Sequence, residues 1–273
     1  MSAIFEHTTS SDVYARYSEL DAATVRSLAD RLEIRAADPR QQRLWSEFLA
    51  GAPAFGGGRV LEIGCGTGVI TALIAGLPGV GEVVGVDPVP YFVERARARL
   101  PDVRFEVADG RGLPFGDESF DGVVFSTTLC HIPGPERALA EAHRVLRTGG
   151  HLLVYDGDYA TTTVATSDVD PLQTCAATAV RTLVHDPWLV RRLPALLREA
   201  GFSPEELRSH GHLELTAPTY MLSLIDLGAD TLVARGTLAP ASGEAFKAEA
   251  RGRVAAGRFF GHIAYASVRA ERR

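Results

Sequence analysis

A chain of 273 residues, of which 46% are hydrophobic, can bury a substantial core and is long enough for one large α/β domain or two small ones. The formal net charge of −6 leaves no basic surface that could neutralise a run of phosphates. Nucleic acid is therefore excluded as an expected partner, and small acceptors that are uncharged or cationic fit better.

The N-terminal segment and the cysteines both favour a cytoplasmic protein without disulfide bonds. Residues 1–20 show no charged-then-apolar signal pattern, and no stretch approaches the roughly 20 apolar residues of a membrane span, so no membrane partner is expected. Cys65, Cys130 and Cys175 are widely spaced and form no CxxC pair. This spacing predicts three reduced thiols and argues against both a disulfide framework and a zinc site.

Residues 59–156 alternate short apolar runs with helical patterns, as βαβ units around a parallel sheet do. Apolar residues recur three and four apart in the intervening stretches YFVERARARL and PERALAEAHRVL, which predicts two amphipathic helices. The second helix is expected to close on Gly149 and Gly150 as its C-cap. The strands predicted in this region are 59–64, 82–87, 103–108, 121–127 and 151–156.

The C-terminal part continues the sheet but interrupts it with helices. Asp170-Pro171 and Asp186-Pro187 each place an N-cap residue before a first-turn proline, which predicts two helix starts. Two more strands are predicted at 205–215 and 259–270, and two helices between them at about 218–235 and 242–257. A plain α/β domain needs only a hairpin turn there, so the helices look like a lid over one end of the sheet.

These elements predict an α/β fold with a doubly wound, seven-stranded, mostly parallel sheet and helical lid insertions. We expect an N-terminal helical lid over residues 1–58 and the main domain over 59–273. Its helical insertions are expected at about 157–186 and 216–257. The lid helices could instead serve a dimer interface, so a homodimer remains open.

The stretch VLEIGCGTGVI ends an apolar run in glycines at alternate positions. Between a strand and a helix, Gly64, Gly66 and Gly68 aim backbone N–H groups and a helix N-terminus at a ligand. A dinucleotide fingerprint needs GxGxxG, but position 69 is Val, and the carboxylate of Glu62 would repel a pyrophosphate while suiting a cation. A turn without a ligand is the alternative, although one tight turn needs only a single glycine of positive φ.

Two further acids follow predicted strands beside this loop. Asp87 ends the second strand, where a carboxylate can accept hydrogen bonds from ribose hydroxyls. Asp109 ends the third strand in VADGRGLPF and could face the adenine side of a nucleoside. Either acid alone could be a solvated turn residue, but Glu62, Asp87 and Asp109 at three successive strand ends favour a cationic nucleoside as the ligand.

Five stretches resemble, in order and spacing, the successive motifs of class I S-adenosylmethionine-dependent methyltransferases: VLEIGCGTG, VVGVDP, VADGRGLPF, FDGVVFSTTLCHI and ERALAEAHRVLRTGGHLLVYD. The resemblance covers roughly residues 59–156 and is greatest to the small-molecule group that includes the ubiquinone and menaquinone methyltransferases. It implies the Rossmann-like methyltransferase fold, with S-adenosylmethionine as cofactor and S-adenosylhomocysteine as product.

The resemblance also implies how the cofactor is held. Residues 62–68 would hold its methionine part, Asp87 the ribose hydroxyls, and Asp109 with Gly110 the adenine, while residues 127–131 would pass beneath the sulfonium. The candidate cofactor-binding residues are therefore Tyr17, Glu62, Gly64, Cys65, Gly66, Gly68, Asp87, Pro88, Asp109, Gly110, Thr127 and Thr128.

The candidate catalytic residues are His131, Tyr14 and Tyr159. Methyl transfer needs orientation, exclusion of water and an unprotonated acceptor, so the protein needs one base or none. His131 lies just beyond the fourth predicted strand, where an imidazole of pKa about 6.5 could accept a proton; packing against the cofactor is its alternative. In such families an N-terminal aromatic segment often folds over the cofactor, and the resemblance therefore makes Tyr14 and Tyr17 candidates. Packing between helices is the alternative role for both tyrosines. Tyr159, like Tyr155 and Asp158, follows the fifth strand and should be near the acceptor.

No catalytic metal is predicted. The metal-dependent branch of this fold places a carboxylate at the end of the fourth strand, where this chain has Ser126, Thr127 and Thr128. Asp156 and Asp158 in YDGDY are two acids without a nearby third ligand, and turn residues are their expected role.

The predicted function is the transfer of a methyl group from S-adenosylmethionine to an O, N or C nucleophile of a small, aromatic or polycyclic molecule of specialised metabolism. One alternative keeps the fold and the bound cofactor but uses the lid pocket for a rearrangement or cyclisation, or only for binding a ligand. A nicotinamide oxidoreductase is the third candidate function, and Val69 and Glu62 argue against it.

Overall fold

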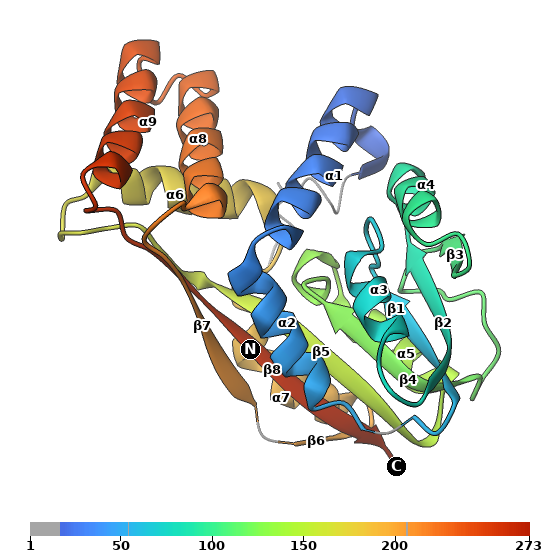
Figure 1. The fold of residues 1–273 in the computed structure, drawn as a ribbon. Helices are drawn as coiled ribbons and strands as arrows, with labels where there is room; N and C mark the ends of the chain where they lie inside the picture. The colour runs from blue at the N-terminus through green and yellow to red at the C-terminus, as the bar shows by residue number, and fades with distance from the viewer. Residues whose placement is uncertain (1–16, 54, 206) are drawn as a thin grey trace, which may run out of the picture.

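The computed structural model describes residues 17–53, 55–205 and 207–273 (Figure 1). The helices are α1 (Ala22–Ala36), α2 (Pro39–Ala50), α3 (Val69–Ala75), α4 (Pro90–Arg99), α5 (Pro135–Val145), α6 (Pro171–Leu183), α7 (Leu189–Glu199), α8 (Thr219–Ala234) and α9 (Pro240–Ala255), with the short 3-10 turns η1 (Tyr17–Glu19) and η2 (Leu129–His131). The strands are β1 (Gly58–Ile63), β2 (Val80–Asp87), β3 (Arg104–Val107), β4 (Phe120–Ser126), β5 (Leu146–Thr163), β6 (Phe202–Pro204), β7 (Arg208–Glu214) and β8 (Gly261–Arg272).

Within those ranges, eight strands form one sheet in the order β3-β2-β1-β4-β5-β8-β6, and β7 also pairs with β8. The first five strands in this order pair in parallel, whereas β8 runs antiparallel to β5, β6 and β7. The predicted α/β class with a mostly parallel sheet is confirmed. The three-residue β6 is the strand that the sequence pattern did not reveal.

The strand order reverses between β1 and β4, and this reversal determines where a ligand can bind. Both strands are near-continuous apolar runs, with Leu61, Ile63, Val123 and Phe125 almost completely buried, as expected when helices cover both faces of a parallel sheet. Because connections leave such a point in opposite directions, a crevice opens outside the carboxyl ends of the two strands.

The chain differs from the predicted pattern around β5. The expected C-cap at Gly149 and Gly150 is wrong: α5 ends at Val145, and β5 begins directly at Leu146. The two glycines lie instead at an irregularity in the pairing of β4 with β5. β5 also continues to Thr163, because β8 pairs with its extension.

The helix expected from Asp186 also starts later. Its N-cap is Trp188, and Asp186 accepts a hydrogen bond from the backbone N–H of Trp188 at 3.0 Å. By contrast, Asp170 is the N-cap of α6 as predicted, and its side chain accepts from the backbone N–H of Leu172.

Helices α6, α8 and α9 group together beyond the end of β5, and α1 stands beside them (Figure 1). α1 contacts both α8 and α4, so it links these helices to the parallel part of the sheet. Among the described residues, no helix combines the length and the apolar character needed to cross a bilayer.

Candidate active site

A cavity lies at the carboxyl ends of the parallel strands, where the strand order reverses. The ends of β1, β2 and β4 and the loop after β3 line one side of it, and α1, α6 and α8 line the other. The sequence-predicted site residues among its lining are Glu62, Gly64, Cys65, Gly66, Asp87, Pro88, Asp109, Gly110, Thr127, Thr128, His131 and Tyr159.

One further candidate, Gly68, is not part of this lining. Gly68 is the N-cap of α3 with φ of 80°, and a Cβ there would lie 3.0 Å from the Cβ of Ala96. The glycine therefore allows the start of α3 to approach α4. Tyr17 opens η1, but its side chain, like the whole of Tyr14, lies outside the described part of the chain.

The loop after β1 forms a backbone cradle against the end of β4. Gly64 and Gly66 have φ of 76° and 52°, in the left-handed region that favours glycine. A Cβ on Gly64 would lie 2.2 Å from Cγ2 of Thr128, so a side chain would fill the cradle. The Cys65 thiol lies in a second apolar cluster with Val93, and burial raises its pKa, so this residue offers the cavity its backbone.

Two buried carboxyl groups flank the cradle. Glu62 is 1% exposed and accepts a hydrogen bond from the hydroxyl of Thr71, and burial raises its pKa to about 8. Asp87 accepts hydrogen bonds at 2.9 Å from the backbone N–H groups of Gly66 and Val89, yet burial raises its pKa to about 6. A cation in the cavity would favour the ionised form of both, so this end suits a positively charged ligand.

The loop after β3 supplies the third acid and a close backbone approach. β3 ends at Val107, so Asp109 lies two residues beyond the strand and not at its end. Its carboxylate pairs with Arg111, which holds the pKa of Asp109 below its usual range. A Cβ on Gly110 would lie 2.6 Å from Cγ2 of Ile63, so the loop lies against β1 only because this residue is glycine.

The end of β4 turns sharply beneath the cavity. Thr127 has φ of 51°, which is uncommon for a β-branched residue, and its N–H donates to the carbonyl of Tyr155 at 2.6 Å. Its hydroxyl accepts a hydrogen bond from Nη2 of Arg35 at 2.7 Å. The turn thus joins the sheet to α1.

His131 and Tyr159 face the same cavity, with ring centroids 6.4 Å apart. Burial raises the pKa of Tyr159 well above its ordinary value, so its hydroxyl stays protonated and acts as a hydrogen-bond donor or acceptor but not as a base. His131 is therefore the better placed of the two to accept a proton.

The other polar residues after the fifth predicted strand have structural contacts. The expectation of turn residues at Asp156 and Asp158 is wrong, because both lie within β5. Asp156 is fully buried and accepts from the backbone N–H of Cys130 at 3.2 Å, which fixes the turn that carries His131. Asp158 pairs with Arg191, and neither Asp158 nor Tyr155 lines the cavity.

Sequence reasoning missed the residues that line the cavity from the helices. α1 contributes Arg31 and Arg35, α8 contributes Tyr220 and Leu224, and the end of α6 contributes apolar side chains such as Leu183. The one available signal was the four-residue spacing of the two arginines, which places both on one face of a helix.

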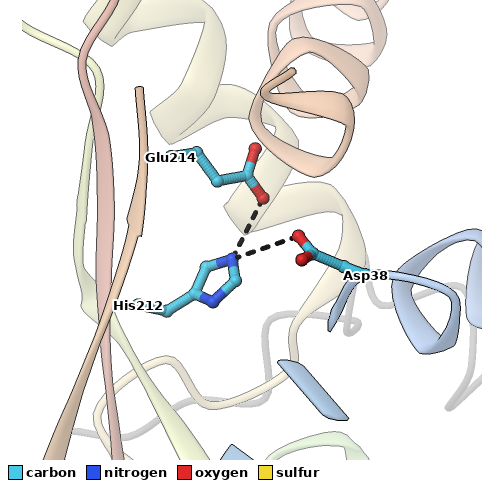
Figure 2. A group of neighbouring side chains, drawn as sticks. All are labelled: Asp38, His212 and Glu214. Atoms are coloured by element: carbon cyan, nitrogen blue, oxygen red, sulfur yellow. Dashed lines mark hydrogen bonds and ion pairs between the residues drawn. The ribbon is translucent and has the colours of Figure 1, made fainter. Parts of the chain in front are cut away.

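A separate polar cluster consists of Asp38, His212 and Glu214, which we call the His212 cluster (Figure 2). Nε2 of His212 lies 3.0 Å from Oε1 of Glu214 and 3.9 Å from Oδ2 of Asp38. Arg40 pairs with Asp38, and the second oxygen of Glu214 accepts from the backbone N–H of Met221 in α8. Because these partners already engage both carboxylates, the cluster ties α2, β7 and α8 together, and none of its three residues lines the cavity.

Replacing His212 by alanine is expected to destabilise the fold by about 3 kcal/mol, because it leaves a buried carboxylate without its partner. His212 and Glu214 are 2% and 0% exposed, so water does not replace the lost contact. Urea unfolding measures the change. His151→Ala, a half-buried histidine in β5, is the control, and equal midpoints for the two variants would contradict the expectation.

Known proteins match this chain in sequence and in fold. A family model described as a methyltransferase domain matches residues 61–154. The O-methyltransferase cnsE of Penicillium expansum is 32% identical over 72% of this chain and 74% of its own length. The demethylmenaquinone methyltransferase of Renibacterium salmoninarum is 33% identical over 60% of this chain and 62% of its own length.

The solved structure of BH2331, a candidate methyltransferase of Bacillus halodurans C-125, superposes with a TM-score of 0.61 at 23% identity. The match covers 84% of this chain and 98% of that protein, and it shows a shared fold. The chain spans less than two thirds of the Renibacterium relative.

Proposed function

Because the chain belongs to the class I S-adenosylmethionine-dependent methyltransferases, we propose that it methylates an oxygen, nitrogen or carbon nucleophile of a small aromatic or polycyclic molecule. S-Adenosylmethionine is the cofactor, and when bound it supplies an electrophilic methyl group. The relatives include an O-methyltransferase, which supports an oxygen acceptor, and a demethylmenaquinone methyltransferase, which supports an acceptor similar to demethylmenaquinone. A role in specialised metabolism is part of the proposal.

The observation that carries this proposal is one cavity with two different sides. The sheet side has the glycine cradle and the carboxyls of Glu62 and Asp87, which fit the cofactor: the cradle leaves room for close backbone approach, and the carboxyls suit a sulfonium. The helix side has the hydroxyl of Tyr220, apolar side chains from α6 and α8 and two arginines of α1, and pockets for small molecules combine apolar walls with a few polar groups in this way.

The residues of this chain then have distinct tasks. Asp87 would accept hydrogen bonds from the ribose, the loop at Gly110 would lie beside the adenine, and the turn at Thr127 would pass beneath the reacting group. Helices α1, α6 and α8 would exclude water, which is why we propose residues 1–58 and the insertions at 157–186 and 216–257 as the lid.

Methyl-labelled cofactor and a panel of hydroxylated naphthalenes, anthraquinones and quinols test the proposal. Labelled product that forms in the presence of EDTA supports metal-independent transfer. Tight binding of S-adenosylhomocysteine without any labelled product favours the cyclase or ligand-binding alternative. Calorimetry that detects no binding of either form of the cofactor contradicts the proposed function.

His131→Ala is expected to lower the methylation rate at neutral pH by about 100-fold, a typical contribution of a general base. The loss should shrink as pH rises and the acceptor ionises without help. The affinity for S-adenosylhomocysteine should stay within about twofold, since the histidine would act on the acceptor. The pH profile of the rate is the measurement, and a loss that is equal at every pH would contradict a role as base.

A further inference from the structure

The cavity has acidic groups on one side and basic groups on the other. The buried carboxyls of Glu62 and Asp87 lie at the ends of β1 and β2, whereas the guanidinium groups of Arg31 and Arg35 project from α1 on the other side. On the proposed function, the sulfonium is a cation and belongs at the carboxyl side. The arginine side then suits a ligand of the opposite sign.

Both arginines donate to hydroxyl groups at the wall of the cavity. Arg35 donates from Nη2 to the hydroxyl of Thr127 at 2.7 Å, directly at the end of β4, and its guanidinium lies 5.8 Å from the ring centroid of Trp45. Arg31 donates from Nη2 to the hydroxyl of Ser223 at 3.3 Å. Arg31 forms no ion pair with any carboxylate in the ranges that the structure describes. Its charge is therefore oriented by a neutral partner and not cancelled by a side chain there.

The walls around these cations are largely apolar. Val180, Leu183 and Val184 come from α6 and its end, and Leu224 comes from α8. A cation facing such a wall loses hydration, and an anionic group of a ligand can compensate through charge-assisted hydrogen bonds. The apolar walls fit the body of an aromatic molecule, so the two features together describe an aromatic anion.

The field of Arg35 already acts on phenol groups in this cavity. Burial raises the pKa values of the hydroxyls of Tyr159 and Tyr220, and the positive charge of Arg35 opposes that rise at each of them. An acceptor hydroxyl bound between α1 and the sheet lies in the same field. The charge of Arg35 would favour its oxyanion in the same direction, and burial would oppose it, as burial does at the two tyrosines.

We propose that the acceptor is an acidic aromatic hydroxyl compound, a phenol or enol bound as its oxyanion, with Arg35 facing the reacting oxygen and Arg31 binding a neighbouring oxygen substituent. The hydroxyl proton leaves first, to His131 or to water. A lone pair of the oxygen then forms the O–CH₃ bond while the S–CH₃ bond breaks and its electron pair stays on sulfur. An anion and a cation thus become a neutral methyl ether and a neutral thioether.

This inference deepens the proposed function and rests on it. It also reverses the expectation from the net charge of −6, which favoured uncharged or cationic acceptors. The whole-chain charge does not describe the cavity, because most carboxylates of the chain lie elsewhere, whereas two arginines project into this cavity from one helix face.

The test uses 4-nitro-1-naphthol, whose ionisation is visible in its absorption spectrum, and its methyl ether as a neutral match of similar shape. With the protein loaded with S-adenosylhomocysteine, the pKa of the bound naphthol should fall by about 1 or more, equal to a tenfold preference for the anion. The ether should bind at least about tenfold more weakly. Equal binding of naphthol and ether, an unchanged naphthol pKa, or binding of neither overturns the inference.

Variants identify which arginine lowers the pKa of the bound naphthol and which one contributes to its affinity. Arg35→Gln should return the naphthol pKa to its value in water, Arg35→Lys should keep most of the effect, and Arg31→Gln should weaken naphthol binding about tenfold. Arg26→Gln, an exposed arginine on the same helix, is the control. Circular dichroism reports whether each variant is folded.

The affinity for the cofactor shows whether the two arginines bind the anionic acceptor or the carboxylate of the cofactor. The affinity for S-adenosylhomocysteine should be the same in wild type, Arg31→Gln and Arg35→Gln. A tenfold loss of that affinity with an unchanged naphthol pKa would assign the arginines to the carboxylate of the cofactor and overturn the inference. A wild-type protein that binds neither form of the cofactor contradicts the proposed function instead, whereas one that binds cofactor but does not acidify the naphthol contradicts this inference alone.

Discussion

Gly64→Ala is expected to raise the dissociation constant for S-adenosylhomocysteine by about 100-fold or more, equal to about 2.8 kcal/mol. The φ of 76° is a conformation that costs a residue with a side chain about 1–2 kcal/mol. In addition, the new Cβ would lie 2.2 Å from Cγ2 and 2.5 Å from Oγ1 of Thr128, so the loop or the end of β4 must move. Both strands are buried, so the loop is the part that gives way.

Calorimetric titration of the folded variant measures this effect, and two variants show its cause. Gly116→Ala adds a Cβ that meets nothing within 4 Å, so it should bind the cofactor like the wild type. Adding Thr128→Gly to Gly64→Ala removes the crowding atoms but not the unfavourable φ, and it should recover part of the affinity. Normal cofactor binding by Gly64→Ala would show that the cradle is not the binding site.

The sheet side of the cavity, where we propose that the cofactor binds, was predictable because its signals are local. A parallel strand that ends in glycines of positive φ needs particular residues within a few positions of the chain. The stretch VLEIGCGTG therefore indicates the conformation of this loop without information from distant segments. The acids near the ends of β1, β2 and β3 were predictable for a similar reason, since the carboxyl ends of parallel strands meet at one edge of the sheet. A glycine needed for helix packing and one needed for a ligand look alike in sequence, so the pattern could not show that Gly68 lies against Ala96.

The helix side of the cavity was not predictable, because it depends on how distant segments meet. Arg35 reaches Thr127 from 92 positions away along the chain, and Arg31 reaches Ser223 from 192 positions away. The extension of β5 to Thr163 likewise depends on pairing with β8. Periodicity found the helices of this region, but it could not show which of their side chains point into one cavity or what charge they bring there.

The affinity for S-adenosylmethionine is expected to rise with pH in two stages. In the free protein, burial raises the pKa of Asp87 to about 6 and that of Glu62 to about 8, so both carboxyls hold protons that a cation must displace. Ionisation of Asp87 should give about a tenfold gain between about pH 5 and pH 7, and ionisation of Glu62 a further gain as pH approaches 8. S-Adenosylhomocysteine, whose sulfur is neutral but whose ribose is the same, should share the stage set by Asp87 and show a weaker dependence on the ionisation of Glu62.

The stability of the free protein should change in the opposite sense. Since both pKa values lie above the ordinary values of 3.8 and 4.5, the folded state binds these two protons more tightly than the unfolded chain. The contribution of the two carboxyls to stability is therefore full below about pH 4, and it falls as pH rises through about 6 for Asp87 and about 8 for Glu62.

Calorimetry in buffers of different ionisation enthalpy measures the protons released on binding, and two isosteric variants separate the two stages. Asp87→Asn should remove the pH dependence below about pH 7 and weaken binding above about pH 6, where the wild-type carboxyl is ionised and the amide cannot ionise. Glu62→Gln should remove the dependence above about pH 7 and leave the lower stage in place. An affinity for the sulfonium that is independent of pH in the wild type would mean that the two buried carboxyls do not face the charge of the cofactor, and the charge separation of the cavity would then need another explanation.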